Sequence, residues 1–131
     1  MKKTFHPDLC KASICLGLQK GYSKTEIHQE DVISYLQLLQ NELIKEKQIH
    51  LSANCFLSNI ILSGQKEPHL NLQFFNYPKF SLPEENFKTS VEWIAERLME
   101  AFDQNRIVVQ FHDGNLMLEK NDAIDPSIMI N

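Results

Sequence analysis

The sequence predicts an α+β fold made of two copies of a strand–helix–strand unit, in the order βαββαβ. Two stretches carry apolar residues three and four positions apart, which is typical of amphipathic helices. Each of these stretches is flanked by short segments in which apolar and polar residues alternate, as in half-buried strands. Val32 in the first helical stripe and Val91 in the second also precede the next strand by similar distances, to Ile49 and to Ile107. These regularities indicate an internal duplication.

The composition is that of an ordinary globular protein. A chain of 131 residues with 43% hydrophobic and 23% charged residues fits one domain with one core. Its net charge of −4 argues against a nonspecific nucleic-acid binder, which needs a basic surface. No apolar run is long enough to span a bilayer. We therefore predict neither nucleic acid nor membrane as a partner.

The three cysteines, Cys10, Cys15 and Cys55, cannot all pair within one chain, and none belongs to a CxxC motif. Reduced thiols in a reducing compartment fit this pattern best. The amino-terminal residues 1–11 lack the continuous apolar segment of a signal peptide. The prediction is a cytoplasmic protein.

We predict a single domain covering residues 1–131. Its predicted parts are a leader at 1–11, a first repeat at 12–63, a second repeat at 70–118 and a tail at 119–131.

The first repeat begins with a strand at 12–18, where isoleucine and leucine alternate with small residues. A helix follows at 29–47, and a second strand at 48–55 is predicted from its period of two. A turn at 56–59 and a short strand at 59–63 complete the repeat. The apolar stripe of the predicted helix consists of Val32, Leu36, Leu39 and Leu43.

The second repeat begins with a strand at 70–75, after a loop at 64–69 marked by glycine and proline. A proline-containing loop at 76–85 leads to the second helix, and a β-branched strand follows at 106–111. An Asp-Gly pair then predicts a tight turn into a short strand at 116–118. The stripe of this helix consists of Phe87, Val91, Ile94, Leu98 and Phe102.

This order predicts a four-stranded mixed sheet with both helices on one face, plus short hairpin strands. The other face of the sheet then has no helix to cover it. It must meet solvent, a ligand or a partner subunit.

The loops that follow the first strand of each repeat share a tyrosine and a lysine, and such loops often build ligand sites. Lysine can hold an anion beside an aromatic ring. The alternative is a packed aromatic residue with a solvated lysine, which is the commoner situation. The candidate ligand-binding residues are Tyr22, Lys24, Tyr77 and Lys79.

Thiol and imidazole groups could in principle bind a soft metal. Their spacing forms no known ligand pair, so we predict no metal site and no cofactor. Cys55 with His50 is a conceivable nucleophile and base, but alternation puts them on opposite faces of the strand. The residues that carry these thiol and imidazole groups are His6, Cys10, Cys15, His50, Cys55, His69 and His112.

Three segments resemble the tautomerase superfamily, in particular the proteins related to migration inhibitory factor. They are SGQKEPHL at 63–70, IAERL at 94–98 and the strand at 106–111. The resemblance implies a homotrimer whose sheets form a barrel, and catalysis by an amino-terminal proline. In this chain Lys2 follows Met1, and Pro7 is the nearest proline. Ferredoxin-like domains share the same element order.

We therefore predict a noncatalytic oligomeric or binding module of tautomerase-like or ferredoxin-like fold, with no catalytic residue identified. The alternative is a tautomerase or isomerase acting on a small keto-enol acid. It would use Pro7 after processing, or another base such as His6.

Overall fold

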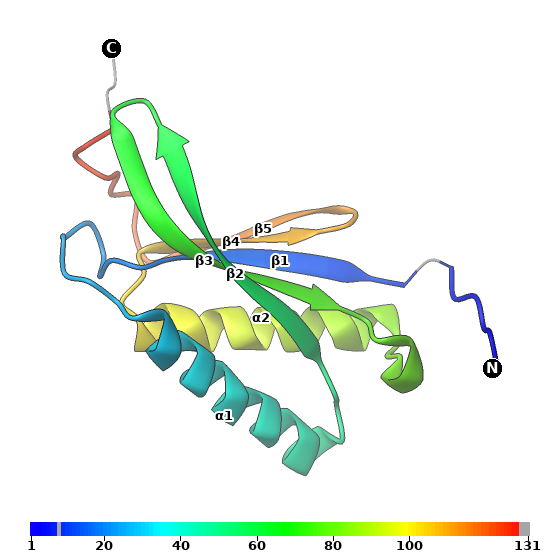
Figure 1. The fold of residues 1–131 in the computed structure, drawn as a ribbon. Helices are drawn as coiled ribbons and strands as arrows, with labels where there is room; N and C mark the ends of the chain where they lie inside the picture. The colour runs from blue at the N-terminus through cyan, green and yellow to red at the C-terminus, as the bar shows by residue number, and fades with distance from the viewer. Residues whose placement is uncertain (8, 129–131) are drawn as a thin grey trace.

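A computed structural model describes residues 1–7 and 9–128 of the chain. Five strands, two α-helices and one turn of 3-10 helix follow one another along it (Figure 1). Their bounds, in chain order, are β1 (Lys11–Gly17), α1 (Gln29–Lys47), β2 (Ser52–Leu62), β3 (Gln65–Phe75), η1 (Pro78–Phe80), α2 (Glu84–Ala101), β4 (Arg106–Phe111) and β5 (Gly114–Glu119).

The strands form one sheet in the order β2-β3-β1-β4-β5, and every neighbouring pair is antiparallel. β1 and β2 therefore run parallel to each other with β3 between them, and β3 and β4 run parallel with β1 between them. These are two interleaved, split βαβ units, the arrangement of ferredoxin-like domains. Both helices lie on the same side of the sheet (Figure 1).

The predicted α+β class, with two helices on one face, is confirmed. The sheet has five strands rather than four main ones, and its neighbouring pairs are antiparallel rather than mixed. The reason is that each repeat places a strand of the other repeat between its own two strands. No parallel pair is then left in direct contact.

The long hairpin of β2 and β3 differs from the predicted strand boundaries. The turn expected at 56–59 and the loop expected at 64–69 are both part of a continuous ladder that runs from Ser52↔Phe75 to Leu62↔Gln65. Only Ser63 and Gly64 connect the two strands, and Gly64 has a φ of 87°. Residues 48–51, predicted as strand, instead link α1 to β2, and Gln48 caps α1 with a left-handed backbone at a φ of 55°.

Pro68 had indicated a loop, yet it lies within β3. Proline lacks a backbone N–H, but its carbonyl can still accept a hydrogen bond. Here the Pro68 carbonyl accepts one from the N–H of Leu18 at 2.9 Å. The strand therefore continues through the proline.

The core lies between the helices and one face of the sheet. The predicted stripe of α1 is buried, and the first four residues of the α2 stripe are completely buried, while Phe102 packs at the edge of the core. Opposite them, the side chains that point from the sheet toward the helices are also fully buried. They are Ile14, Leu16, Leu70, Leu72, Phe74, Ile107 and Val109.

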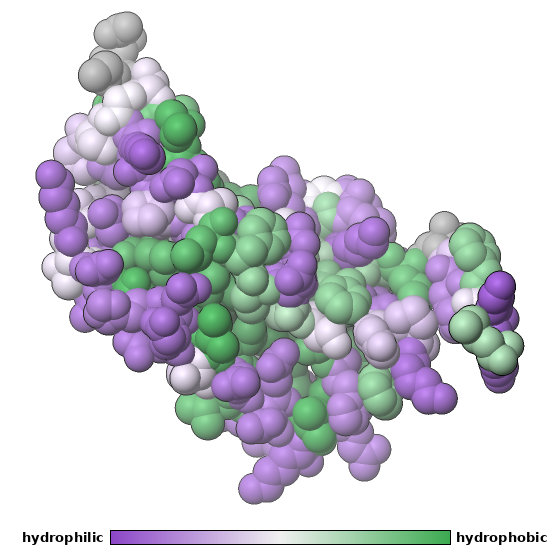
Figure 2. Space-filling model, viewed as in Figure 1, coloured by the Kyte–Doolittle hydropathy of each residue, from purple (hydrophilic) through white to green (hydrophobic). Residues whose placement is uncertain are grey.

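The β2–β3 hairpin extends past the end of the helices (Figure 1). Its tip is consequently uncovered, and several apolar side chains there are exposed: Leu57, Ile60, Ile61 and Leu62. In the same view, the molecular surface is hydrophobic near the centre and mostly hydrophilic along its lower rim (Figure 2). Within the described residues, neither helix has both the length and the apolar character that crossing a membrane requires.

Two leucines on the helices, one buried and one exposed, allow the contribution of the core to stability to be tested. Leu98 is fully buried on α2, whereas Leu38 is 60% exposed on α1. We expect Leu98→Ala to lower the free energy of unfolding by about 2–5 kcal/mol, because it leaves a cavity. Leu38→Ala should cost less than about 1 kcal/mol. Urea unfolding followed by circular dichroism measures both, and equal losses would contradict this packing.

Candidate functional site

The uncovered face of the sheet carries polar side chains along β3. Its residues alternate between the core, where Leu70 and Leu72 are buried, and the open face. The open-face row of β3 consists of Glu67, His69, Asn71 and Gln73. This row gives the uncovered face acid, imidazole and amide groups at neighbouring positions.

One hollow of about 360 Å³ lies where β1 ends, and we call it the Glu67 pocket. The first four strands, β1 to β4, all contribute to its lining. The loop after β1, the segment that joins α2 to β4 and the tail after β5 complete it. The polar lining residues used below are Tyr22, Gln65, Glu67, Gln104, Arg106 and Asp125.

Glu67 is the half-buried carboxyl group of this pocket. Gln65 Nε2 donates a hydrogen bond to Glu67 Oε2 at 2.6 Å and a longer one to Asp125 Oδ2 at 3.3 Å. Burial raises the pKa of Glu67, and the nearby Asp125 raises it further, although His69 and Gln65 act in the opposite direction. A carboxyl group of this kind holds its proton more tightly than an exposed glutamate.

A hydrogen-bonded group around Tyr22 forms a second wall of the Glu67 pocket. The Tyr22 hydroxyl donates to the carbonyl of Ala123 at 2.8 Å and accepts from Asn105 Nδ2 at 3.0 Å and from Arg106 Nη1 at 3.3 Å. Arg106 Nε also donates to Glu119 Oε2 at 2.8 Å. These contacts hold the guanidinium of Arg106 in a defined place at the pocket.

Gly17 and the buried Gln104 close the end of β1. Gln104 Nε2 donates to the carbonyl of Gly17 at 3.1 Å, and the N–H of Gly17 donates to Gln104 Oε1 at 3.2 Å. A Cβ atom at position 17 would collide with the Glu67 carboxylate and crowd Gln104. Glycine at this position therefore leaves room for the Glu67 carboxylate to lie against the backbone of β1.

The chemistry of the Glu67 pocket suits a small molecule with both charged and apolar parts. Glu67 and Asp125 supply negative charge or proton transfer, Arg106 supplies positive charge, and Ile60 and Val108 supply apolar surface. Among the lining residues Glu67 has a shifted pKa, which is a common property of functional carboxyl groups.

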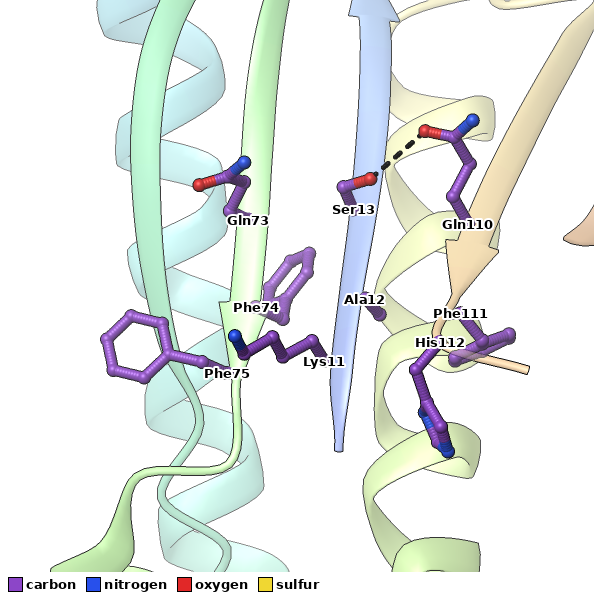
Figure 3. A pocket seen from close by; sticks show the side chains of 9 residues that line it. All are labelled: Lys11, Ala12, Ser13, Gln73, Phe74, Phe75, Gln110, Phe111 and His112. Carbon is purple, nitrogen blue, oxygen red and sulfur yellow. Dashed lines mark hydrogen bonds between the residues drawn. The ribbon is translucent and has the colours of Figure 1, made fainter. Parts of the chain in front are cut away.

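A larger hollow of about 580 Å³ lies toward the other end of β1 (Figure 3). The Ser13 hydroxyl donates there to Gln110 Oε1 at 3.2 Å, with the rings of Phe75 and Phe111 and the side chain of Lys11 nearby. Among its described lining residues there is no carboxyl group. We place the candidate site at the smaller Glu67 pocket, because acid, base and amide groups converge there.

The four predicted ligand-binding residues do not come together. Tyr22 lines the Glu67 pocket, while Lys24 is exposed in the same loop and does not line it. Tyr77 and Lys79 line a different hollow, together with His6. β1 and β3 are antiparallel, so the loops that follow them lie at opposite ends of the sheet.

The half-buried thiols serve as packing and hydrogen-bonding groups. Cys15 Sγ donates to Asn71 Oδ1 at 2.9 Å, and Asn71 Nδ2 donates in turn to Ser58 Oγ. Burial raises the pKa of both Cys15 and Cys55 above the ordinary thiol value. His50 stacks on the ring of Phe80, with 4.8 Å between ring centres. A thiolate nucleophile is not favoured at either cysteine.

Glu67, Gln104 and Arg106 were not predicted as site residues from the sequence. The signal for Glu67 was present, because the alternation of residues 70–75 continues backward through His69 and Glu67. The assignment of 64–69 to a loop concealed it. Gln104 and Arg106 follow the second helix and belong to no sequence motif. They line the pocket because β1 ends beside them, and the sequence does not show that neighbour.

The chain was compared with known proteins. No protein-family model matches it, and no curated protein matches it significantly. Two solved structures do match: a phage SAM lyase in the apo state and a phage SAM lyase in complex with S-methyl-5'-thioadenosine. The apo structure has a TM-score of 0.67 at 18% identity, covering 95% of this chain and 99% of its own. The complex has a TM-score of 0.64 at 18% identity, covering 92% and 96% respectively.

These matches correct two predictions. The resemblance to the tautomerase superfamily and migration inhibitory factor is wrong, because the similar structures are SAM lyases. The noncatalytic module and its tautomerase alternative are contradicted by the same finding, since both similar structures are enzymes. The three quoted segments misled because their patterns are those of any strand and amphipathic helix. A single chain does not test the predicted homo-oligomer, which stays a prediction.

The raised pKa of Glu67 predicts a pH dependence of stability. The folded protein holds the Glu67 proton more tightly than the unfolded chain, so ionisation of this carboxyl group opposes folding. Wild type should therefore lose stability relative to Glu67→Gln as pH rises from about 4.3, the ordinary glutamate value, through the folded pKa. Urea unfolding of both proteins between about pH 4 and pH 8 measures the difference.

Glu100→Gln is the matched control for this experiment, because Glu100 is exposed near the end of α2. A wild type that instead gains stability relative to Glu67→Gln as pH rises would show that the pKa of Glu67 is lowered.

Proposed function

We propose that this protein is a lyase that cleaves S-adenosylmethionine and releases S-methyl-5'-thioadenosine. One observation carries the proposal: a chain matching the SAM lyase fold over nearly its whole length places the half-buried Glu67 carboxyl in a pocket on its open sheet face. The fold alone would not carry it, because one fold hosts many functions. The pocket supplies the chemical groups that the reaction needs.

Release of the thioadenosine breaks the bond between the sulfonium sulfur and the methionine side chain. The electron pair of that bond stays on sulfur, so the positive charge of the substrate disappears from sulfur as the bond breaks. A lyase does this without water, so the carbon that loses sulfur must receive an electron pair from the substrate itself. Either the substrate carboxylate attacks this carbon and closes a cyclic ester, or a base removes a proton from the neighbouring carbon and a double bond forms. The four-carbon fragment leaves as that second product. The site must therefore bind a cation while keeping the reacting bond away from solvent.

The Glu67 pocket can meet the first requirement. Glu67 and Asp125 attract the sulfonium and ammonium charges of the substrate. Ile60 and Val108 offer apolar surface to the uncharged parts of the substrate. Arg106 can pair with the substrate carboxylate, because a guanidinium suits planar anions. Glu67 is the candidate general acid or base of the pocket, since burial raises its pKa above the ordinary carboxyl value.

The cytoplasm remains the proposed compartment. All three cysteines are free, which supports a reducing environment.

The direct test is incubation of the purified protein with S-adenosylmethionine, followed by chromatographic detection of S-methyl-5'-thioadenosine. Wild type should release it, and Glu67→Gln should lower kcat/KM by at least about 100-fold, as loss of an acid–base group does. Glu100→Gln is the control and should retain wild-type activity. Absence of product from folded wild-type protein would refute the proposal, and full activity of Glu67→Gln would remove Glu67 from the mechanism.

Gly17→Ala provides a second test that leaves every charge in place. The added methyl group must displace the Glu67 carboxylate, because the collision is with the movable end of that side chain. We expect kcat/KM to fall at least about tenfold while circular dichroism stays unchanged. Gly114→Ala is the matched control, since a Cβ atom at that glycine has no neighbour within 4 Å. Equal activity of both variants would argue against a fixed position of Glu67.

A further inference from the structure

Three groups of the kinds that bind metal ions meet at the opposite end of the sheet from the Glu67 pocket. They are the thiol of Cys10, a carboxylate oxygen of Glu84 and a ring nitrogen of His112, all within 4.8 Å of one another. Cys10 immediately precedes β1, Glu84 is the first residue of α2, and His112 follows β4. Three segments far apart in sequence thus converge on one point, which we call the Cys10 cluster.

The cluster combines a buried soft donor with two accessible ones. Cys10 is 6% exposed, whereas the side chains of His112 and Glu84 are 42% and 54% exposed. His112 Nε2 lies 3.0 Å from Glu84 Oε1. Figure 3 shows His112 just after the last residue of β4, beside the start of β1. An ion can enter from the exposed side and meet the thiol at the bottom.

The donor set matches one metal in particular. Zinc takes thiolate, imidazole and carboxylate together, in a tetrahedron whose donor atoms lie roughly 3.3–3.8 Å apart. The three donors lie within 4.8 Å of one another, so side-chain rotations that bring them closer would complete the tetrahedron. Calcium and magnesium prefer all-oxygen sites, which a thiol does not provide.

The charges around the cluster also permit a cation. Lys88 lies 3.6 Å from Glu84 and competes for it, but its ammonium is held by Asp113 at 2.5 Å. Asp113 therefore balances Lys88, and the carboxylate of Glu84 and a thiolate at Cys10 together balance a divalent ion. The local charge would be close to zero with zinc bound.

We propose that Cys10, Glu84 and His112 form a zinc site, with water in the fourth position. Binding breaks the S–H bond of Cys10, forms a zinc–sulfur bond and releases the proton to solvent. Because β1 is seven residues long, the site lies about 20 Å from the Glu67 pocket. Its role is to tie the start of β1 and α2 to the β4–β5 turn, and it is independent of the proposed lyase activity.

The test uses the full chain, purified without an affinity tag and stripped of metal, and titrated with cobalt(II) as a spectroscopic substitute for zinc. We expect one equivalent to bind, with a near-ultraviolet sulfur-to-cobalt charge-transfer band that zinc abolishes. Cys10→Ser should eliminate that band, and His112→Gln should weaken cobalt binding at least about tenfold. Zinc should also raise the Tm of wild type but not that of Cys10→Ser.

Cys55→Ser is the matched control, because Cys55 is a half-buried cysteine outside the cluster. It should bind cobalt as wild type does. Circular dichroism of each metal-free variant establishes that it is folded, and His112→Gln, at an exposed side chain, keeps the test valid if Cys10→Ser does not fold. The proposal is overturned if wild type shows no thiolate–cobalt band, or if Cys55→Ser loses the band while Cys10→Ser keeps it.

Discussion

The central position of β1 is the constraint on which the rest of this structure depends. β1 pairs with β3 along its whole length and with β4 over residues 12–14, so backbone pairing holds it on both edges. On the helix side, Ile14 and Leu16 are completely buried. A strand held on both edges and on one face can move little, and the groups next to its two ends are therefore fixed by the core.

The Glu67 pocket lies at one end of β1 and the Cys10 cluster lies at the other. Glu67, Gln104 and Arg106 surround its final residue, Gly17, and Cys10 precedes its first residue. In both places the side chains come from separate segments that the sheet brings together. This arrangement agrees with the general rule that rigid elements place functional groups most accurately.

The uncovered face of the sheet explains the electrostatics of the candidate site. The helices are all on the other side, so no helix covers the open-face row of β3 (Figure 1). Glu67 is half-buried there without a direct cationic partner at hydrogen-bond distance among the described residues. Burial without such a partner raises the pKa of a carboxyl group. An open sheet face can in this way hold a carboxyl group of raised pKa without any motif in the sequence.

The sequence by itself determined the α+β class, both helices and their buried stripes, because periods of 3.6 and 2 are imposed locally by which face of each element meets the core. It also indicated an uncovered sheet face. Strand pairing could not be obtained this way, so residues 64–69 were assigned to a loop, and Tyr77 and Lys79 were grouped with Tyr22 although the antiparallel sheet separates them. Only the tertiary structure decided that Glu67 faces Gly17 and that Cys10 meets Glu84 and His112. These contacts join residues distant in the chain, and their positions follow from strand order and register, which no local pattern encodes.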